Sequence, residues 1–208
     1  MTVVSWFVVL GGFVMDLFPF FPGARISLQS GWLPSGAADA LLAGLLEEVP
    51  WEVHRIHIFG REVNSPRLSC WVGDPQASYR YSGRCFQPRP WRPALAELRM
   101  CLEGETGAVF NSVLLNRYRH GGDAIGWHSD DEAELGIDPL IASVSLGASR
   151  RFVFRHRSER HLRAECVLSH GDLLLMGGTT QRDYQHALPR TLRVVGERVN
   201  LTFRRILM

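Results

Sequence analysis

The stretch RVNLTFR, residues 198–204, alternates polar and apolar side chains over its whole length. Successive side chains of an extended strand point to opposite faces, so Arg198, Asn200, Thr202 and Arg204 share one face of a predicted strand. A face of this kind is usually the solvated side of a sheet. Two arginines that flank hydrogen-bonding side chains also fit a clamp for a dicarboxylate, because each guanidinium can bind one carboxylate through two parallel hydrogen bonds.

The second half of the chain, which ends with this stretch, has the pattern of a β-protein. Short apolar or alternating runs are separated by glycine, aspartate and proline, which is typical of strands in a sandwich or barrel. The other predicted strands are residues 113–115, 141–146, 151–155, 166–168 and 172–176.

The first half shows two amphipathic helical patterns instead. Apolar residues recur at helical spacing over residues 34–49, with Ser35 as the expected N-cap and Pro50 as the stop. A second helix is expected from residue 93 to about residue 103, and it begins with a proline. Helices followed by strands predict an α+β domain in which the helices cover one face of a β-sandwich.

The composition of the 208 residues, with 46% hydrophobic and 21% charged residues, is that of an ordinary globular protein. Residues 3–14 are strongly apolar, yet no basic segment precedes them, no small-residue cleavage site follows, and the run is too short to span a bilayer. We interpret residues 1–14 as an upstream-start extension, with Met15 as the true start. Residues 15–208 are then expected to form a single domain of a soluble, cytoplasmic protein of bacterial type, without a membrane anchor.

The positive charge of the chain comes entirely from arginine. The formal net charge is only +2, so any argument for a polyanionic partner depends on where the arginines cluster. One cluster consists of Arg150, Arg151, Arg155, Arg157, Arg160 and Arg163, and a smaller one of Arg55, Arg61 and Arg67. A run of charge is often no more than a solvated face, but this concentration predicts an electrostatic track for nucleic acid.

A candidate metal site lies in the segment IGWHSDDE, residues 125–132. His128 and Asp130 are two residues apart, so along an extended chain both side chains can reach the same ion. His186, in QHALP, is the best third ligand, because it follows a predicted strand and a polar loop. Two histidines and one carboxylate leave coordination positions open, as non-haem Fe(II) requires. The three residues alone are weak support, since this pattern also occurs by chance.

Seven motifs together resemble the AlkB family of oxidative DNA and RNA dealkylases. They occur in that family's order over roughly residues 59–207. The motifs are Asn116-x-Tyr118, HSDDE (128–132), SLG (145–147), RFVFRH (151–156), GDLLLM (171–176), HALP (186–189) and RVNLTFR (198–204).

The resemblance implies a fold and a cofactor site. The fold is a double-stranded β-helix, a jelly-roll core with supporting N-terminal helices. His128, Asp130 and His186 would bind Fe(II). By the same resemblance, the two carboxylates of 2-oxoglutarate would be bound by Arg198 and Arg204, with hydrogen bonds from Asn116, Tyr118, Asn200 and Thr202.

The activity implied is oxidative demethylation of bases of the N1-methyladenine and N3-methylcytosine type in DNA, which amounts to repair of alkylation damage. The reaction would consume O2 and 2-oxoglutarate and release succinate, carbon dioxide and formaldehyde. Such methylated bases are cationic at neutral pH, so a nearby carboxylate would help to select them. Asp131, beside the predicted metal ligand, is the candidate for this role.

A base must leave the helical stack before it can reach the iron, so flat side chains are expected to hold it. Tyr79 and Tyr81 share one face of a predicted strand and match the segment that grips the substrate in the family, although aromatic stripes of this period are more often core. Arg67, in a segment similar to a substrate-access loop, and Arg155 are predicted to contact the nucleic acid.

Three alternatives stay open at the level of sequence. RNA or a protein is an alternative substrate of the same chemistry, since the iron and co-substrate residues would look the same. A non-catalytic nucleic-acid-binding β-sandwich belongs to a different class, but such a module has no use for a paired carboxylate clamp. The protein is expected to act as a monomer.

Overall fold

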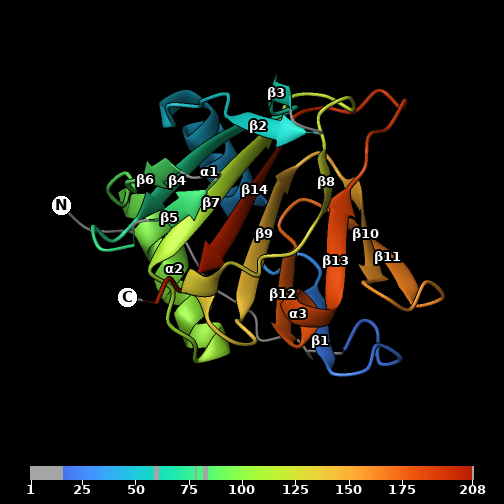
Figure 1. Ribbon diagram of the computed structural model, residues 1–208. Coiled ribbons are helices and arrows are strands. Elements are labelled where there is room, and N and C mark those ends of the chain that lie inside the picture. The colour runs from blue at the N-terminus through green and yellow to red at the C-terminus, as the bar shows by residue number, and fades with distance from the viewer. Residues whose placement is uncertain (1–15, 59–60, 78, 82–83, 208) are drawn as a thin grey trace.

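A computed structural model describes residues 16–58, 61–77, 79–81 and 84–207 (Figure 1). Met15, interpreted as the true start, lies outside these residues. The larger of two facing sheets, here called the major sheet, has six antiparallel strands in the order β1-β12-β9-β14-β7-β4. Its strands are β1 (Ala24–Gln29), β4 (Leu68–Gly73), β7 (Ser112–Tyr118), β9 (Ile141–Gly147), β12 (Leu173–Gly178) and β14 (Arg198–Arg204).

The minor sheet lies beside the major sheet and has four antiparallel strands in the order β11-β10-β13-β8 (Figure 1). Its strands are β8 (Ile125–His128), β10 (Arg150–His156), β11 (Arg163–Leu168) and β13 (Tyr184–Leu188). Two further hairpins are formed by β2 (Arg55–Ile58) with β3 (Arg61–Asn64), and by β5 (Tyr79–Tyr81) with β6 (Arg84–Phe86). The expected α+β fold with a double-stranded β-helix core is confirmed.

Strand β14, the stretch RVNLTFR, lies in the middle of the major sheet between β9 and β7. All seven of its residues are buried. The apolar residues Val199, Leu201 and Phe203 enter the main hydrophobic core. The polar residues face a cavity between the sheets instead of bulk water. The polar face is therefore a buried wall of that cavity and not the solvated side of a sheet.

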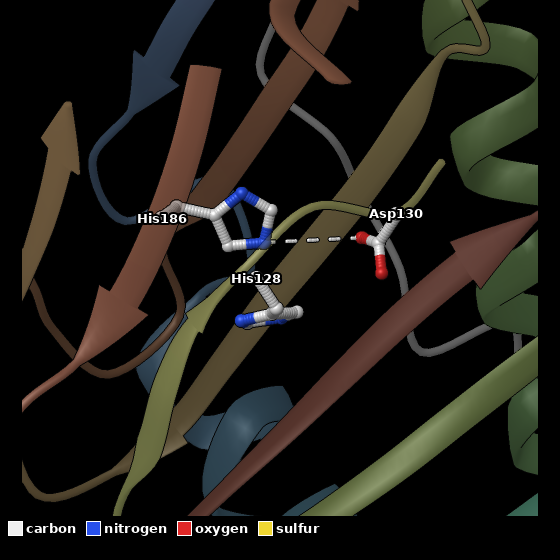
Figure 2. A group of neighbouring side chains, drawn as sticks. All are labelled: His128, Asp130 and His186. Atoms are coloured by element: carbon white, nitrogen blue, oxygen red, sulfur yellow. Dashed lines mark ion pairs between the residues drawn. The ribbon is translucent and has the colours of Figure 1, made fainter. Parts of the chain in front are cut away.

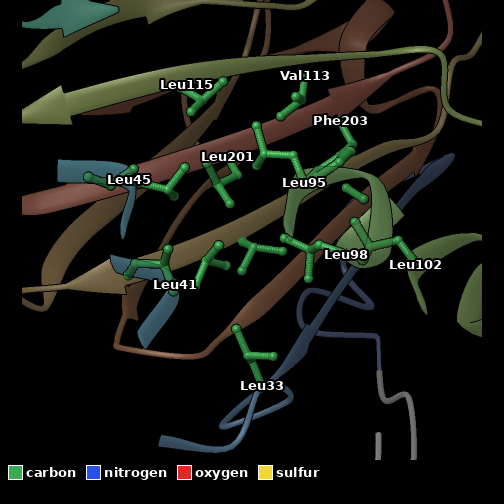
Figure 3. Close-up of a cluster of buried hydrophobic side chains, with 14 of the residues drawn as sticks. Leu33, Leu41, Leu45, Leu95, Leu98, Leu102, Val113, Leu115, Leu201 and Phe203 are labelled. Carbon is green, nitrogen blue, oxygen red and sulfur yellow. The ribbon is translucent and has the colours of Figure 1, made fainter. Parts of the chain in front are cut away.

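The main core lies between the major sheet and two helices, α1 (Ser35–Glu48) and α2 (Pro93–Thr106) (Figure 3). Helix α1 contributes Leu41 and Leu45, and α2 contributes Leu95, Leu98 and Leu102. The last three are fully buried. Burial of each such leucine stabilises the fold by roughly 1.5–3 kcal/mol, which fixes the back of the sheet that carries the polar wall.

The helix ends differ slightly from the sequence prediction. Ser35 is the first residue of α1, while Pro34 is the N-cap and makes no side-chain capping bond. Proline suits this boundary because its ring fixes φ and favours the turn into the helix. Helix α2 continues three residues beyond the predicted end and stops at Gly107, whose φ of 68° is the left-handed conformation that closes many helices.

A second core fills the space between the two sheets beside the cavity. Ile26 and Ile141 of the major sheet pack there with Phe154 and Tyr184 of the minor sheet. Phe21, which precedes β1, stacks on Tyr184 with ring centroids 4.5 Å apart. These contacts hold the sheets at a fixed separation next to the polar site. Among the described residues, no helix is both long and apolar enough to cross a bilayer.

Candidate active site

A cavity of about 370 Å³ lies between the two sheets. Its major-sheet wall comes from three adjacent strands, because Asn200 of β14 is in register with Asn116 of β7 and Ser145 of β9. The minor sheet contributes histidines from β8 and β13. A volume of this order is typical of pockets for small molecules.

The three residues of the predicted triad line this cavity, and their side chains lie close to one another (Figure 2). His128 ends β8 and is directly opposite His186 on the neighbouring strand β13. Asp130 follows two residues after His128, in the segment that leaves the strand. One ligand atom of each residue lies within 4.8 Å of the others. Strand pairing therefore brings the distant histidine to the HxD pair, as the predicted metal site requires.

Burial and neighbouring charges set the protonation of the triad. Burial lowers the pKa of His186 to about 3, and it also lowers the pKa of His128. Burial alone would raise the pKa of Asp130, but Arg204 and the two histidines outweigh it and hold the pKa below its usual value. Neutral imidazoles and an ionised carboxylate are the states in which these groups bind a metal.

The orientation of His128 is fixed by its own strand. Its Nδ1 lies 2.8 Å from the carbonyl oxygen of Gly126. A carbonyl can only accept, so Nδ1–H donates and the lone pair of Nε2 is left for a metal. The His186 ring packs against the His128 ring, with centroids 4.3 Å apart, and against Phe152 at 5.4 Å.

Residues for which the sequence predicted no role at the metal site hold the HxD segment in place. Gln181, in the short helix α3 (Thr180–Asp183), is 1% exposed, and its Oε1 accepts a 2.9 Å hydrogen bond from the backbone N–H of Asp130. Ser129 Oγ donates to the carbonyl of Tyr184 at 2.6 Å. Arg157 donates to Ser129 Oγ at 2.9 Å and forms an ion pair with Asp131. No spacing rule links Gln181 to Asp130, so this contact could not be predicted from the sequence.

The two arginines of β14 stand on the polar wall of the cavity. Arg198 is 1% exposed and its Nη2 donates to Ser145 Oγ at 2.9 Å and to Asn200 Oδ1 at 2.7 Å. Burial lowers its pKa to about 10, so the guanidinium stays charged at neutral pH. Arg204 forms a buried ion pair with Asp130. Through this ion pair, Arg204 connects the polar wall to the triad.

Two N–H donors of the polar wall are left for a ligand. The Nε–H groups of Arg198 and Arg204 are buried, and neither finds a hydrogen-bond partner within the described part of the chain. A buried N–H without a partner costs roughly 1–3 kcal/mol, more for a charged group. An anionic ligand in the cavity would satisfy both, which fits the dicarboxylate expected from the sequence. Likewise, the two neutral histidines and the carboxylate fit an Fe(II) ion with open positions.

The remaining residues of the predicted co-substrate set also line the cavity. Tyr118 lies under Arg198, whose guanidinium carbon is 5.4 Å from the ring centroid. Thr202 Oγ1 accepts from Asn200 Nδ2 at 3.0 Å. Asn116 Oδ1 accepts from Nε of Arg67 at 2.8 Å. Arg67, predicted to contact nucleic acid, therefore lies inside the cavity beside the co-substrate wall.

Two of the residues predicted to bind the substrate, Asp131 and Arg155, do not line the cavity. The backbone of Tyr79 and Tyr81 forms strand β5, as expected, but their side chains fall outside what the structure describes. Asp131 turns away from the cavity and pairs with Arg157 at the surface. Glu132, the next residue, lines the cavity instead. Arg155 lies on the outer face of the minor sheet, where its Nη2 bonds Gln185 Oε1 at 2.7 Å.

The larger arginine cluster does not form one continuous track, which corrects the sequence interpretation. Arg150 is 3% exposed and donates to the carbonyls of Asp123 and Pro189 at 3.0 and 2.8 Å. Arg151 is neutralised by an ion pair with Glu165. The alternation of β10 explains this, because neighbouring arginines on a strand must point to opposite faces. Of the smaller cluster, Arg55 is exposed, and the side chain of Arg61 is outside the described residues.

Comparison with known proteins agrees with this geometry. Residues 25–204 match the family model described as the 2OG-Fe(II) oxygenase superfamily. The chain is 42% identical to human "DNA oxidative demethylase ALKBH2" over 181 residues, which cover 82% of this chain and 69% of that protein. It is 38% identical to human "Alpha-ketoglutarate-dependent dioxygenase alkB homolog 3" over 192 residues, which cover 88% of this chain and 66% of the relative.

A solved structure shares the fold. "The structure of OsALKBH1" superimposes with a TM-score of 0.60 at 16% sequence identity, covering 86% of this chain and 96% of that one. At this identity the likeness concerns the fold alone. The family model and the relatives of about 40% identity go further, because they extend over most of the chain, and residues 25–204 of the family match include the triad and β14. The chain therefore belongs to the 2OG-Fe(II) oxygenase superfamily and, within it, to the AlkB family.

Proposed function

We propose that this protein oxidatively demethylates alkylated bases of the N1-methyladenine and N3-methylcytosine type in DNA, and so repairs alkylation damage. The observation that carries the proposal is that the triad and the polar wall line the same cavity and are linked by the ion pair between Asp130 and Arg204. The 42% identity to a protein named as a DNA oxidative demethylase supports the choice of substrate.

In this proposal each part of the cavity has a separate task. His128, Asp130 and His186 hold Fe(II), and Arg198 and Arg204 bind the carboxylates of 2-oxoglutarate. Bound iron, with 2-oxoglutarate and O2, supplies the oxidant that converts the N-methyl group to N-hydroxymethyl, with succinate and carbon dioxide as co-products. The N–CH2OH group then loses formaldehyde and leaves the unmodified base. The protein's own contribution is to position the methyl group and to exclude water.

A carboxylate at the cavity wall would favour a cationic methylated base over its neutral counterpart. Glu132 lines the cavity, whereas Asp131 is paired with Arg157 outside it. The two residues make a matched pair for mutation. If Glu132 faces the base, Glu132→Gln raises KM for the cationic base while Asp131→Asn leaves it near the wild-type value. The opposite result would return the role to Asp131.

The deciding experiment measures both halves of the reaction. Protein purified without oxygen is given Fe(II), ascorbate and 2-oxoglutarate, together with methylated single-stranded DNA, double-stranded DNA or RNA. We expect formaldehyde and unmodified base in equal amounts from at least the DNA substrates. Decarboxylation of 2-oxoglutarate without turnover of any methylated nucleic acid would refute the repair function and leave only the oxygenase. Turnover restricted to RNA would favour the RNA alternative.

The match over residues 25–204 supports the proposal of one domain within residues 15–208. The monomeric state and the cytoplasmic location stay predictions. Size-exclusion chromatography and localisation of a tagged full-length protein would test them.

A further inference from the structure

Trp127 lies at an unusual place for a large aromatic residue. It immediately precedes the metal ligand His128 and lines the same cavity, yet 41% of its surface is exposed. It belongs to β8, the edge strand of the minor sheet (Figure 1). At this edge Trp127 borders both the cavity and the solvent.

Arg155 holds the Trp127 ring from one side. Its guanidinium carbon lies 4.3 Å from the centroid of the indole. The guanidinium is fixed in turn by Gln185, whose Oε1 accepts from Nε at 3.0 Å and from Nη2 at 2.7 Å. Arg155 covers one ring face, and 41% of the surface of Trp127 stays exposed. The result is a flat aromatic surface that is fixed in advance and backed by a cation.

The charge of Arg155 is not cancelled by a neighbour. Its partner Gln185 is neutral, and no carboxylate in the described part of the chain lies within ion-pair distance of it. Arg163 is opposite Arg155 in the register of β10 and β11, and among the described residues its one hydrogen-bond acceptor is the carbonyl of Arg160. Arg151, on the same face, is instead neutralised by Glu165. The positive charge of this face is therefore concentrated near Trp127.

We propose that Trp127 and Arg155 form a binding subsite for the nucleotide next to the base that enters the cavity. The neighbouring base stacks on the open face of the indole, and its phosphate is bound by Arg155. Stacking of a base on an aromatic side chain tolerates any base, because every base has a π face, and a guanidinium complements phosphate. The subsite rests on the proposed function, since it defines the substrate as a strand that extends beyond the methylated nucleotide.

The test uses short single strands and the full-length protein loaded with Mn(II) and 2-oxoglutarate for binding, or with Fe(II) for turnover. One pentanucleotide carries a central N1-methyladenine. Two others carry, in addition, an abasic site directly 5′ or directly 3′ of it. Fluorescence anisotropy gives Kd, and formaldehyde release gives KM and kcat. The variants are Trp127→Ala and Trp127→Phe. The matched control is the double variant Arg151→Gln/Glu165→Gln, which removes a neutralised arginine without changing the net charge.

We expect Trp127→Ala to raise Kd and KM of the intact pentanucleotide by about 10-fold, the usual order for one stacked base, with little change in kcat. Trp127→Phe should retain most of the affinity, and the control should match the wild type. One of the two abasic sites should weaken binding to the wild type by a similar factor and have no further effect on Trp127→Ala. This loss of additivity identifies Trp127 as the surface on which that base stacks.

Two results would overturn the subsite. One is an abasic effect of the same size in wild type and Trp127→Ala, which would place the neighbouring base elsewhere. The other is an equal loss of affinity in the control, which would mean that the sheet face acts only through general electrostatics. Failure of the proposed function is distinguishable, because the wild type would then bind the strands by anisotropy and release no formaldehyde.

Discussion

Asp130 and Asp131 are adjacent carboxylates in very different surroundings. Asp130 is 3% exposed, accepts from Arg204 and lies beside both histidines of the triad. Asp131 is paired with Arg157 at the surface, with half of its side chain in solvent. A buried charge without its partner is expensive, while a surface ion pair contributes little.

The substitutions Asp130→Asn and Asp131→Asn should therefore separate clearly. Without metal, Asp130→Asn leaves Arg204 buried without a counter-charge, and we expect it to lower the free energy of unfolding by about 3–5 kcal/mol. Asp131→Asn should lower the free energy of unfolding by about 1 kcal/mol or less. Urea denaturation of the metal-free variants measures both values. Equal stabilities would mean that the Asp130–Arg204 pair is solvated in solution.

Asp123 provides a pH-dependent prediction away from the metal site. Asp123 is 2% exposed, and its carboxylate accepts from Arg119 Nε at 2.7 Å, Arg119 Nη2 at 2.9 Å and the Arg119 backbone N–H at 3.0 Å. Burial opposes ionisation, but the hydrogen bonds from Arg119 outweigh it and lower the pKa below the ordinary value of 3.8. A lowered folded-state pKa means that this stabilisation is present above pH 3.8 and disappears as the pH falls through the folded-state value.

Asp123→Asn should thus be less stable than the wild type at pH 7, by roughly 1.5–3 kcal/mol, the usual value of hydrogen bonds to a charged group. The difference should begin to shrink below about pH 4, because the unfolded wild-type chain then binds a proton at Asp123, and it should disappear once the pH is below the folded-state pKa as well. Urea denaturation between pH 3 and pH 7 would show this convergence. A difference that stays constant over this range would exclude ionisation of Asp123 as its source.

At the scale of elements, β14 combines two functions on its two faces. Leu201 is fully buried in the core under the helices, while Asn200 and Thr202 line the cavity on the other side. The opposite orientation of successive side chains lets one strand supply core packing and ligand contacts at once. Both faces are buried because β9 and β7 flank the strand and layers cover the sheet on either side.

Leu201→Ala should therefore destabilise the fold and leave the polar wall of the cavity unchanged. We expect the free energy of unfolding to fall by about 2–5 kcal/mol, because contacts are lost and a cavity remains. The KM for 2-oxoglutarate in the folded protein should stay near the wild-type value. Val167→Ala, at a site 58% exposed on β11, is the control and should change stability by about 0.5 kcal/mol or less. A large rise in the KM of Leu201→Ala would show that the two faces are coupled.

At the scale of the whole molecule, the candidate ligand site joins the two sheets. His128 and His186 come from the minor sheet, and Arg198 and Arg204 come from the major sheet. A metal ion together with a dicarboxylate would contact both sheets at once. Any ligand that binds only the folded state raises its stability in proportion to the logarithm of its concentration.

Mn(II) and 2-oxoglutarate together should raise the Tm in a concentration-dependent way. At 100 times Kd the stabilisation is about 2.7 kcal/mol, and removal of the metal with a chelator should reverse it. Differential scanning fluorimetry measures the shift, with Arg198→Gln as the variant in which 2-oxoglutarate adds little beyond the metal alone. An unchanged Tm in wild type with both ligands would contradict the assignment of the cavity.

The features that depend on local spacing could be predicted from the amino-acid sequence. The period of two in RVNLTFR identified four polar side chains on one face, and the HxD spacing identified two of the three metal ligands. Longer elements such as α1 and α2 were also predicted, to within a few residues, because they repeat their pattern several times. In the two facing sheets, strands β1, β4, β8 and β13 were not predicted. In β4 the cause is burial on both faces, which removes the alternation, and in β8 it is a length of four residues that include a glycine.

What each of those side chains faces depends on the folded arrangement of the chain. The pairing of β8 with β13 brought His186 to His128, and the position of β14 in mid-sheet turned an apparently solvated face into a cavity wall. The fold also buries Arg150, leaves Asp131 outside the cavity and brings Gln181 into hydrogen-bonding distance of the Asp130 backbone N–H. The physical reason is that burial and charge pairing depend on contacts between residues far apart in the chain, and a local pattern does not contain them.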